Sequence, residues 1–74
     1  MNDTMIDMDY AHVDNLNVDQ VMIDDLIEID GEIVTITSIA PLRYGYLFSY
    51  KNDFGETETQ DFTDDATFKL FLLM

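Results

Sequence analysis

Residues 25–39 constrain the fold more than any other stretch, because they place an Asp30-Gly31 pair between two apolar, alternating runs. A two-residue type I′ turn needs positive φ at both central positions, which glycine adopts without strain and aspartate tolerates. The run after the pair is β-branched almost throughout, which suits a pleated strand and lowers helix preference. The stretch therefore predicts a β-hairpin against which the rest of the chain packs.

The turn also predicts the register of the hairpin and the side chains that share each face. The expected facing pairs are Ile29 with Glu32, Ile27 with Val34, and Asp25 with Ile36. The core face is expected to carry Ile27, Ile29, Val34 and Ile36. The opposite, mostly wetter face is expected to carry Leu26, Glu28, Ile33, Thr35 and Thr37.

Three further strands are predicted beyond the hairpin, at residues 46–51, 56–62 and 67–73. Ala40-Pro41 is expected to end the preceding strand, because proline cannot donate to a strand ladder. The expected turns are Tyr44-Gly45, residues 52–55 with Gly55 at positive φ, and Asp64-Asp65.

The last strand is apolar and would be an aggregation hazard if it were left exposed. Phe68, Leu70 and Leu72 are expected to point inward. The strand must be covered, either by the first strand of the same chain, which would close a barrel, or by a partner chain in a homo-oligomer.

Residues 1–16 show no clear period, and they carry several aspartates and no basic residue. They predict an acidic N-terminal tail, or an extended arm on a neighbouring subunit, ahead of a β-domain at residues 17–74. Residues 17–22 are expected to form one helical or 3₁₀ turn that covers an open end of the sheet, with Asn17 as its N-cap.

The chain has a net charge of −13, with only three basic residues among 74. Contacts to phosphate need lysine and arginine, so direct binding to nucleic acid or to an anionic membrane is not expected. Such a charge favours partners with a basic surface. The alternative is that it serves only to keep the protein soluble. The chain has no cysteine and no apolar run of the roughly 20 residues that span a bilayer. A soluble, cytoplasmic protein is expected.

Five short strands with tight turns predict an all-β fold, a small open barrel. The pattern over residues 20–74 resembles SH3-like barrels, and it centres on residues 21–36, which read VMIDDLIEIDGEIVTI. KOW-type modules and small phage-encoded accessory proteins often share this hydrophobic lead-in, apolar alternation and Asp-Gly-Glu. Asp24 stands where such domains usually carry glycine. The resemblance implies a five-stranded SH3-like barrel and a role in binding RNA or protein, of which the charge favours protein.

No constellation of catalytic residues is evident. His12 is the only histidine, and there is neither a nucleophile motif nor a glycine-rich phosphate loop. The pairs Asp24-Asp25 and Asp64-Asp65 are predicted to be solvated turns rather than acid–base dyads. Residues 61–65 lack the spacing of an EF-hand loop. We expect no enzyme activity, no cofactor and no metal.

The aromatic residues are numerous for so small a domain. Phe48, Phe62 and Phe68 are expected in the core, and the surplus aromatics at a surface, where they anchor partners well. Ordinary exposure of the same tyrosines is an equal alternative. The predicted partner-binding residues are Tyr44, Tyr46, Phe54, Asp53, Glu56, Glu58, Asp64 and Asp65.

Three functions are compatible with these features. The first is a non-catalytic protein-interaction module, a phage accessory protein that binds or inhibits a host protein. The second is an acidic mimic of nucleic acid that blocks a DNA- or RNA-binding protein. The third is a virion or assembly component that uses the N-terminal arm.

Overall fold

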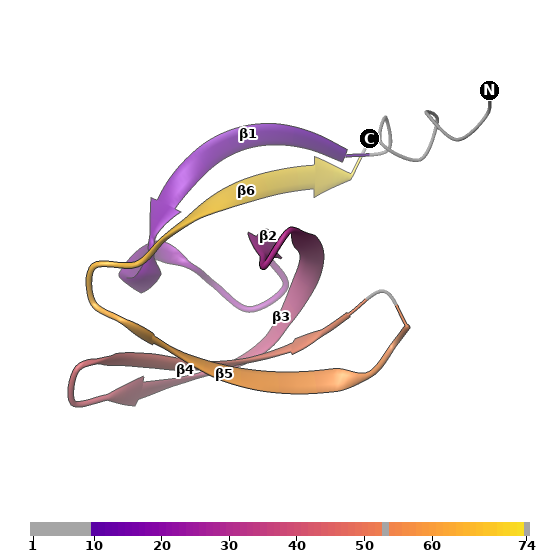
Figure 1. Ribbon diagram of the computed structural model, residues 1–74. Coiled ribbons are helices and arrows are strands. Elements are labelled where there is room, and N and C mark those ends of the chain that lie inside the picture. The colour runs from indigo at the N-terminus through magenta and orange to yellow at the C-terminus, as the bar shows by residue number, and fades with distance from the viewer. Residues whose placement is uncertain (1–9, 53, 74) are drawn as a thin grey trace, which may run out of the picture.

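A computed structural model describes residues 10–52 and 54–73. These residues form one antiparallel sheet and a 3₁₀ turn, with the elements β1 (Tyr10–Asn17), η1 (Val18–Gln20), β2 (Leu26–Ile29), β3 (Glu32–Leu42), β4 (Gly45–Lys51), β5 (Thr57–Thr63) and β6 (Thr67–Leu73). The strand order is β1-β6-β2-β3-β4-β5, so β1 and β5 are the two edges. Figure 1 shows the sheet strongly curved, with β1 and β6 at one end and β4 and β5 at the other. The all-β class is confirmed, although the sheet has six strands where the sequence indicated five.

The β2–β3 hairpin has the predicted turn and register. Asp30 has a φ of 54° and Gly31 a φ of 84°, as a type I′ turn requires. Ile29 pairs with Glu32 and Ile27 with Val34. The backbone N–H of Ile36 donates to the carbonyl of Asp25 over 3.0 Å, which extends the hairpin as expected.

The core lies on the concave side of the sheet. Most of its buried side chains come from alternating positions of neighbouring strands, and Val18 and Val21 are added from η1 and the segment after it. Phe48 is completely buried, and its ring lies 5.4 Å from that of Phe62 and 5.6 Å from that of Phe68, centroid to centroid. Phe62 is partly buried and packs against the same cluster. The buried side chains are Val18, Val21, Ile27, Ile29, Val34, Ile36, Phe48, Tyr50 and Phe68. The predicted core face of the hairpin and the three predicted core phenylalanines are confirmed.

The N-terminal prediction was wrong for residues 10–16, which form most of β1 rather than a tail. β1 pairs with β6 along its whole length, from Tyr10 opposite Leu73 to Asn17 opposite Thr67. The apolar strand β6 offers backbone groups and apolar side chains that only a second strand can cover, and β1 supplies them from the same chain. Residues 1–9, the rest of the predicted tail, lie outside the described residues.

The predicted helical turn is present as η1. The backbone N–H of Asn17 donates to Oε1 of Gln20 over 2.8 Å at the start of this turn. Val18 is buried, and its backbone N–H donates to the carbonyl of Ala66 over 3.1 Å. The turn therefore joins the end of β1 to the loop before β6. In Figure 1 it is the short coiled ribbon directly after β1.

Strand β6 is covered within the chain, since it lies between β1 and β2. Its pairing with β2 is short, because only Leu70 and Phe71 have partners there, namely Ile27 and Leu26. Leu72 extends past this contact and is 58% exposed, so the prediction that it points into the core was wrong.

The expected end of the second hairpin strand at Ala40-Pro41 was also wrong, because β3 continues to Leu42. Pro41 lies opposite Tyr46, next to the pair Leu42–Gly45 that flanks a two-residue turn. In such a hairpin the flanking pair exchanges hydrogen bonds and the next pair does not. The nitrogen of Pro41 therefore faces away from β4, and no donor is needed there.

The turn before β4 consists of Arg43 and Tyr44, one residue earlier than predicted. Gly45 begins the strand instead of completing the turn. A Cβ atom at Gly45 would lie 1.8 Å from the carbonyl oxygen of Phe62, so only glycine allows β4 and β5 to approach this closely.

Candidate protein-binding surface

The loop between β4 and β5 is organised by the side chain of Asn52. Its Oδ1 accepts the backbone N–H groups of Phe54 at 2.9 Å and Glu56 at 3.0 Å. Its Nδ2 donates to carboxylate oxygens of Glu58 at 2.7 Å and Glu56 at 3.3 Å. Gly55 has a φ of 78°, as predicted, and its N–H donates to the carbonyl of Asn52 over 3.0 Å. The loop is thus held by hydrogen bonds rather than by apolar burial.

Phe54 is the most exposed large apolar side chain among the described residues, at 83%. Its backbone is fixed by Asn52, while its ring packs into no part of the core. The carboxylates of Glu56 and Glu58 lie at the base of the same loop, bonded to Asn52. An aromatic ring on a fixed backbone, flanked by carboxylates, is suited to contact a partner that offers an apolar pocket with basic groups around it.

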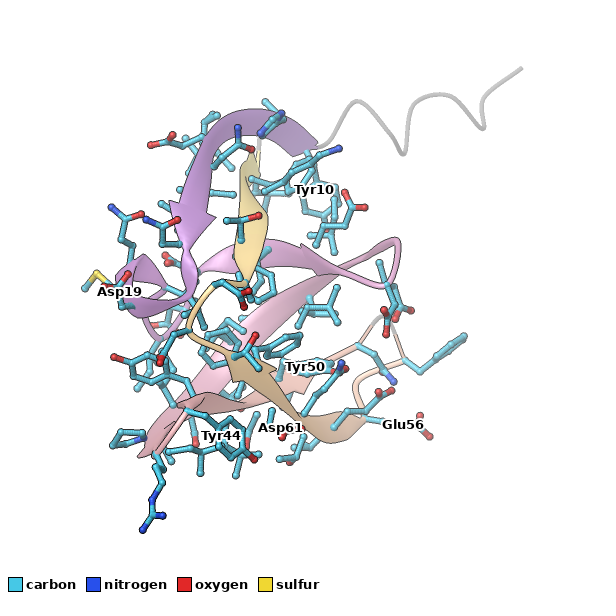
Figure 2. All side chains as sticks on the ribbon, turned by 60° about the vertical axis from the view of Figure 1, so that its left-hand side comes forward. Tyr10, Asp19, Tyr44, Tyr50, Glu56 and Asp61 are labelled. Atoms are coloured by element: carbon cyan, nitrogen blue, oxygen red, sulfur yellow. The ribbon has the colours of Figure 1, made fainter. Side chains whose placement is uncertain are left out.

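The opposite end of the β4–β5 hairpin carries a second exposed aromatic residue, Tyr44, at 51%. Its hydroxyl donates to Oδ2 of Asp61 over 3.0 Å, and its carbonyl accepts the backbone N–H of Asp64 at 2.9 Å. The hydrogen bond to Asp61, together with the charge of that carboxylate, raises the pKa of Tyr44 above 10.0. Figure 2 shows Tyr44 beside Asp61, with Glu56 at the far end of β5.

The predicted partner-binding residues therefore lie at two separate ends of the hairpin. Phe54, Glu56 and Glu58 share one end, whereas Tyr44, Asp64 and Asp65 share the other. Strand β4 has seven residues, so the two ends are roughly 20 Å apart at about 3.3 Å per residue. Tyr46 is only partly exposed, because it packs against the core. Asp53 lies outside the described residues.

Two features of the surface were missed in the sequence. Asp61 was not recognised as the partner of Tyr44, because the residues are far apart in the chain and meet only through the β4–β5 pairing. The outer face of β1 and β6 was missed as well, since residues 10–16 were expected to be a tail. There the ring of His12 lies 5.6 Å from that of Phe71, and Leu73 is 67% exposed.

The side chain of His12 forms hydrogen bonds within its own strand, β1. Its Nε2 lies 3.0 Å from the carbonyl oxygen of Asp14 and 2.9 Å from Oδ1 of Asn15, so this nitrogen carries a proton and donates it to both acceptors. Within residues 10–52 and 54–73, no group of three or more potential ligands is placed to hold a metal ion. No helix in this part of the chain is long and apolar enough to cross a membrane.

The two acidic pairs lie in turns. Asp24 has a φ of 78°, a backbone conformation that favours glycine. It is the position at which the SH3-like domains named above usually carry glycine. Oδ2 of Asp25 accepts the backbone N–H of Met22 over 2.8 Å. Oδ1 of Asp65 accepts the hydroxyl of Thr63. The two pairs lie in or next to turns, as predicted, and the carboxylates of Asp25 and Asp65 bond to groups of those turns.

Comparisons with protein-family models, with curated proteins and with solved structures found no match.

Proposed function

We propose that this chain is a non-catalytic, acidic protein-interaction module that inserts Phe54 into an apolar pocket of its partner. The observation that carries the proposal is the 83% exposure of Phe54 on a loop fixed by Asn52. By the sequence resemblance to small phage-encoded accessory proteins, the proposed role is to bind or inhibit a host protein.

The energetics of such a contact favour this loop over other exposed apolar residues. Ordering a flexible loop on binding costs about 0.5–1.5 kcal/mol for each immobilised side chain, and a loop that is already ordered avoids much of that cost. The bonds from Asn52 to Phe54, Glu56 and Glu58 supply this order before any partner arrives. Buried aromatic anchors of this kind typically contribute about 2 kcal/mol or more to binding.

The finer fold that we propose is an SH3-like open barrel formed by β2–β6, with β1 as an addition. It is supported by the strand order, in which these five strands are contiguous and the last of them, β6, lies beside the first, β2. The curvature in Figure 1 brings the two halves of the sheet around one core. In this arrangement the β4–β5 loop projects from one end of the barrel, free of the core.

The test uses immobilised wild-type protein, Phe54→Ala and Tyr44→Ala on the same bacterial lysate, with washes of increasing salt and mass spectrometry of the retained proteins. The partner should be retained by wild type and Tyr44→Ala but lost with Phe54→Ala, and a dissociation constant measured with the purified partner should rise at least about 30-fold for Phe54→Ala. Tyr44→Ala is the matched control, because it removes an exposed aromatic ring at the other end of the hairpin.

Equal retention by all three proteins would reject the Phe54 anchor. Capture of a nucleic-acid-binding protein that is released by moderate salt, without regard to Phe54, would instead favour the nucleic-acid mimic. Interaction through Phe54 should survive high salt, because apolar burial is not screened.

A further inference from the structure

The edge strand β5 presents backbone groups that have no partner among the described residues. The bonds Asn52 N–H to the Glu56 carbonyl and Asp64 N–H to the Tyr44 carbonyl mark the hydrogen-bonded positions at both ends of the β4–β5 ladder. Because such positions alternate in an antiparallel pair, Glu58, Gln60 and Phe62 bond to β4 in between. The backbone N–H and carbonyl groups of the intervening residues therefore point away from β4. These residues are Thr57, Thr59, Asp61 and Thr63.

These outward-facing groups form an almost continuous row. The carbonyl of Thr63 is occupied, because it accepts the backbone N–H of Ala66 over 3.1 Å. The four outward N–H groups and the carbonyls of Thr57, Thr59 and Asp61 take part in no hydrogen bond to another described residue. The pairing of β5 with β4 is regular, without a bulge, so the row follows the spacing that a further strand requires.

The other edge of the sheet, β1, is interrupted in its middle. Its register shifts between His12 and Asp14, which marks a β-bulge. The carbonyl of Asp14 accepts a hydrogen bond from the ring of His12, and the N–H of Asn15 donates to the side chain of Asp14 over 2.8 Å. These two backbone groups are therefore already bonded to side chains of the same strand. A β-bulge is one of the devices by which proteins prevent strand addition at an edge. Of the two edges of the described sheet, β5 is therefore the one with a regular row of free backbone groups.

The charge around β5 selects the occupant. Residues 52–66 contain six acidic residues and no basic one. Glu58 shares the face of Tyr50, and Asp61 lies on the opposite face, so carboxylates flank the edge on both sides. Pairing with the β5 strand of a second copy would bring two such sets of carboxylates together, which is unfavourable. A strand that carries lysine or arginine would meet opposite charges instead.

We propose that β5 accepts an extended, lysine- or arginine-containing segment of the partner protein as a seventh strand of the sheet. The inference rests on the proposed function and specifies the chemistry of its partner. Main-chain hydrogen bonds to Thr57, Thr59 and Asp61 would provide affinity, and the carboxylates would provide selectivity. Phe54 lies just before β5 in the chain, so one partner could contact both the loop and the edge.

The test is amide hydrogen exchange followed by NMR, with two synthetic heptapeptides as probes, one of alternating lysine and valine and one of alternating glutamate and valine. In the free protein, the amides of Thr57, Thr59 and Asp61 should exchange fast, whereas those of Glu58, Gln60 and Phe62 should be protected by β4. The lysine peptide at about ten times its dissociation constant should slow exchange of the fast set about tenfold. The glutamate peptide should not slow it.

Thr59→Pro is the diagnostic variant, since it removes one outward N–H at a position where the strand ladder does not need a donor. It should abolish the protection of Thr57 and Asp61 by the lysine peptide. Thr59→Val keeps the N–H and should retain that protection. Preserved protection of Gln60 and Phe62 in both variants verifies that the sheet is intact.

Three results would overturn the proposal. They are binding of the lysine peptide without protection of the outward amides, equal protection by the glutamate peptide, and concentration-dependent protection without peptide, which would indicate pairing between copies of this chain. The peptides carry no pocket for Phe54, so the outcome with Phe54→Ala should equal that of wild type. A failed edge experiment therefore leaves the Phe54 result standing, and the reverse also holds.

Discussion

The hydroxyl of Tyr44 donates to Oδ2 of Asp61 over 3.0 Å, although the two residues are seventeen positions apart in the chain. Tyr44 lies in the turn before β4, and Asp61 lies on β5 opposite Leu47. The bond therefore joins the β3–β4 turn to the edge strand, and it depends on the register of the β4–β5 pairing.

The first prediction concerns this bond. Asp61→Asn removes the carboxylate charge and should lower the pKa of Tyr44 toward 10.0, because the hydrogen bond to Asp61 and its charge are the main causes of the shift. The measurement is an NMR titration of the tyrosine Cζ signals. Tyr50 is the internal control, since its raised pKa comes first from burial and then from Glu58, Asp30 and Glu32. A Tyr44 pKa that does not change in the variant would show that Asp61 is not the cause.

The second prediction is a loss of stability at alkaline pH. Tyr44 and Tyr50 keep their phenol protons in the folded protein at a pH where the unfolded chain has lost them, because both pKa values are raised above 10.0. This stabilisation is fully present below pH 10 and is lost as the pH rises through the raised values. Urea unfolding at pH 9 and pH 11 should show the decrease. Tyr44→Phe should show a smaller decrease, and an equal one would contradict the role of Tyr44.

The third prediction concerns the aromatic core. Phe48→Ala should reduce the free energy of unfolding by about 3–5 kcal/mol, because the ring is completely buried and packs against the rings of Phe62 and Phe68. The matched control is Phe54→Ala, which removes the same ring from an exposed position and should change stability by no more than about 0.5 kcal/mol. Equal effects in denaturant titrations would mean that the two environments had been assigned incorrectly.

The fourth prediction concerns β1. A chain that begins at Val18 lacks this strand and leaves one side of the apolar strand β6 unpaired. We expect a loss of cooperative unfolding and self-association, detected by light scattering and size-exclusion chromatography. A chain that begins at Tyr10 keeps β1 and is the control. If the shorter chain stayed monomeric with unchanged stability, β1 would be dispensable, as expected of a tail.

The sequence predicted local structure well where one pattern acts alone. Asp30-Gly31 set the turn, the turn set the register, and the register placed Ile27 and Val34 in the core. The bounds of the last strand, Thr67–Leu73, also agree with the prediction. Such features depend on neighbours in the chain, so composition and period are sufficient to find them.

The candidate site was harder to predict, because it depends on contacts that cross the sheet. The sequence predicted Phe54 as a contact residue, but it grouped Phe54 with Tyr44, which lies at the other end of the hairpin. Nothing in the sequence indicated that Oδ1 of Asn52 would accept the backbone N–H groups of both Phe54 and Glu56. An asparagine in a turn has many possible acceptors and donors, and only the folded loop selects among them.

The sequence by itself determined the all-β class, the central hairpin and the acidic surface, because alternation, turn residues and charge are properties of the chain. Only the tertiary structure decided that residues 10–16 complete the sheet, since their weak pattern acquires a strand conformation from the open side of β6. It also decided which edge remains available. The side chains of His12 and Asp14 form hydrogen bonds with backbone groups of β1. In the regular ladder of β5, the backbone groups of every second residue point outward. Hydrogen bonding between strands is a non-local property, and it is fixed only when all strands are in place.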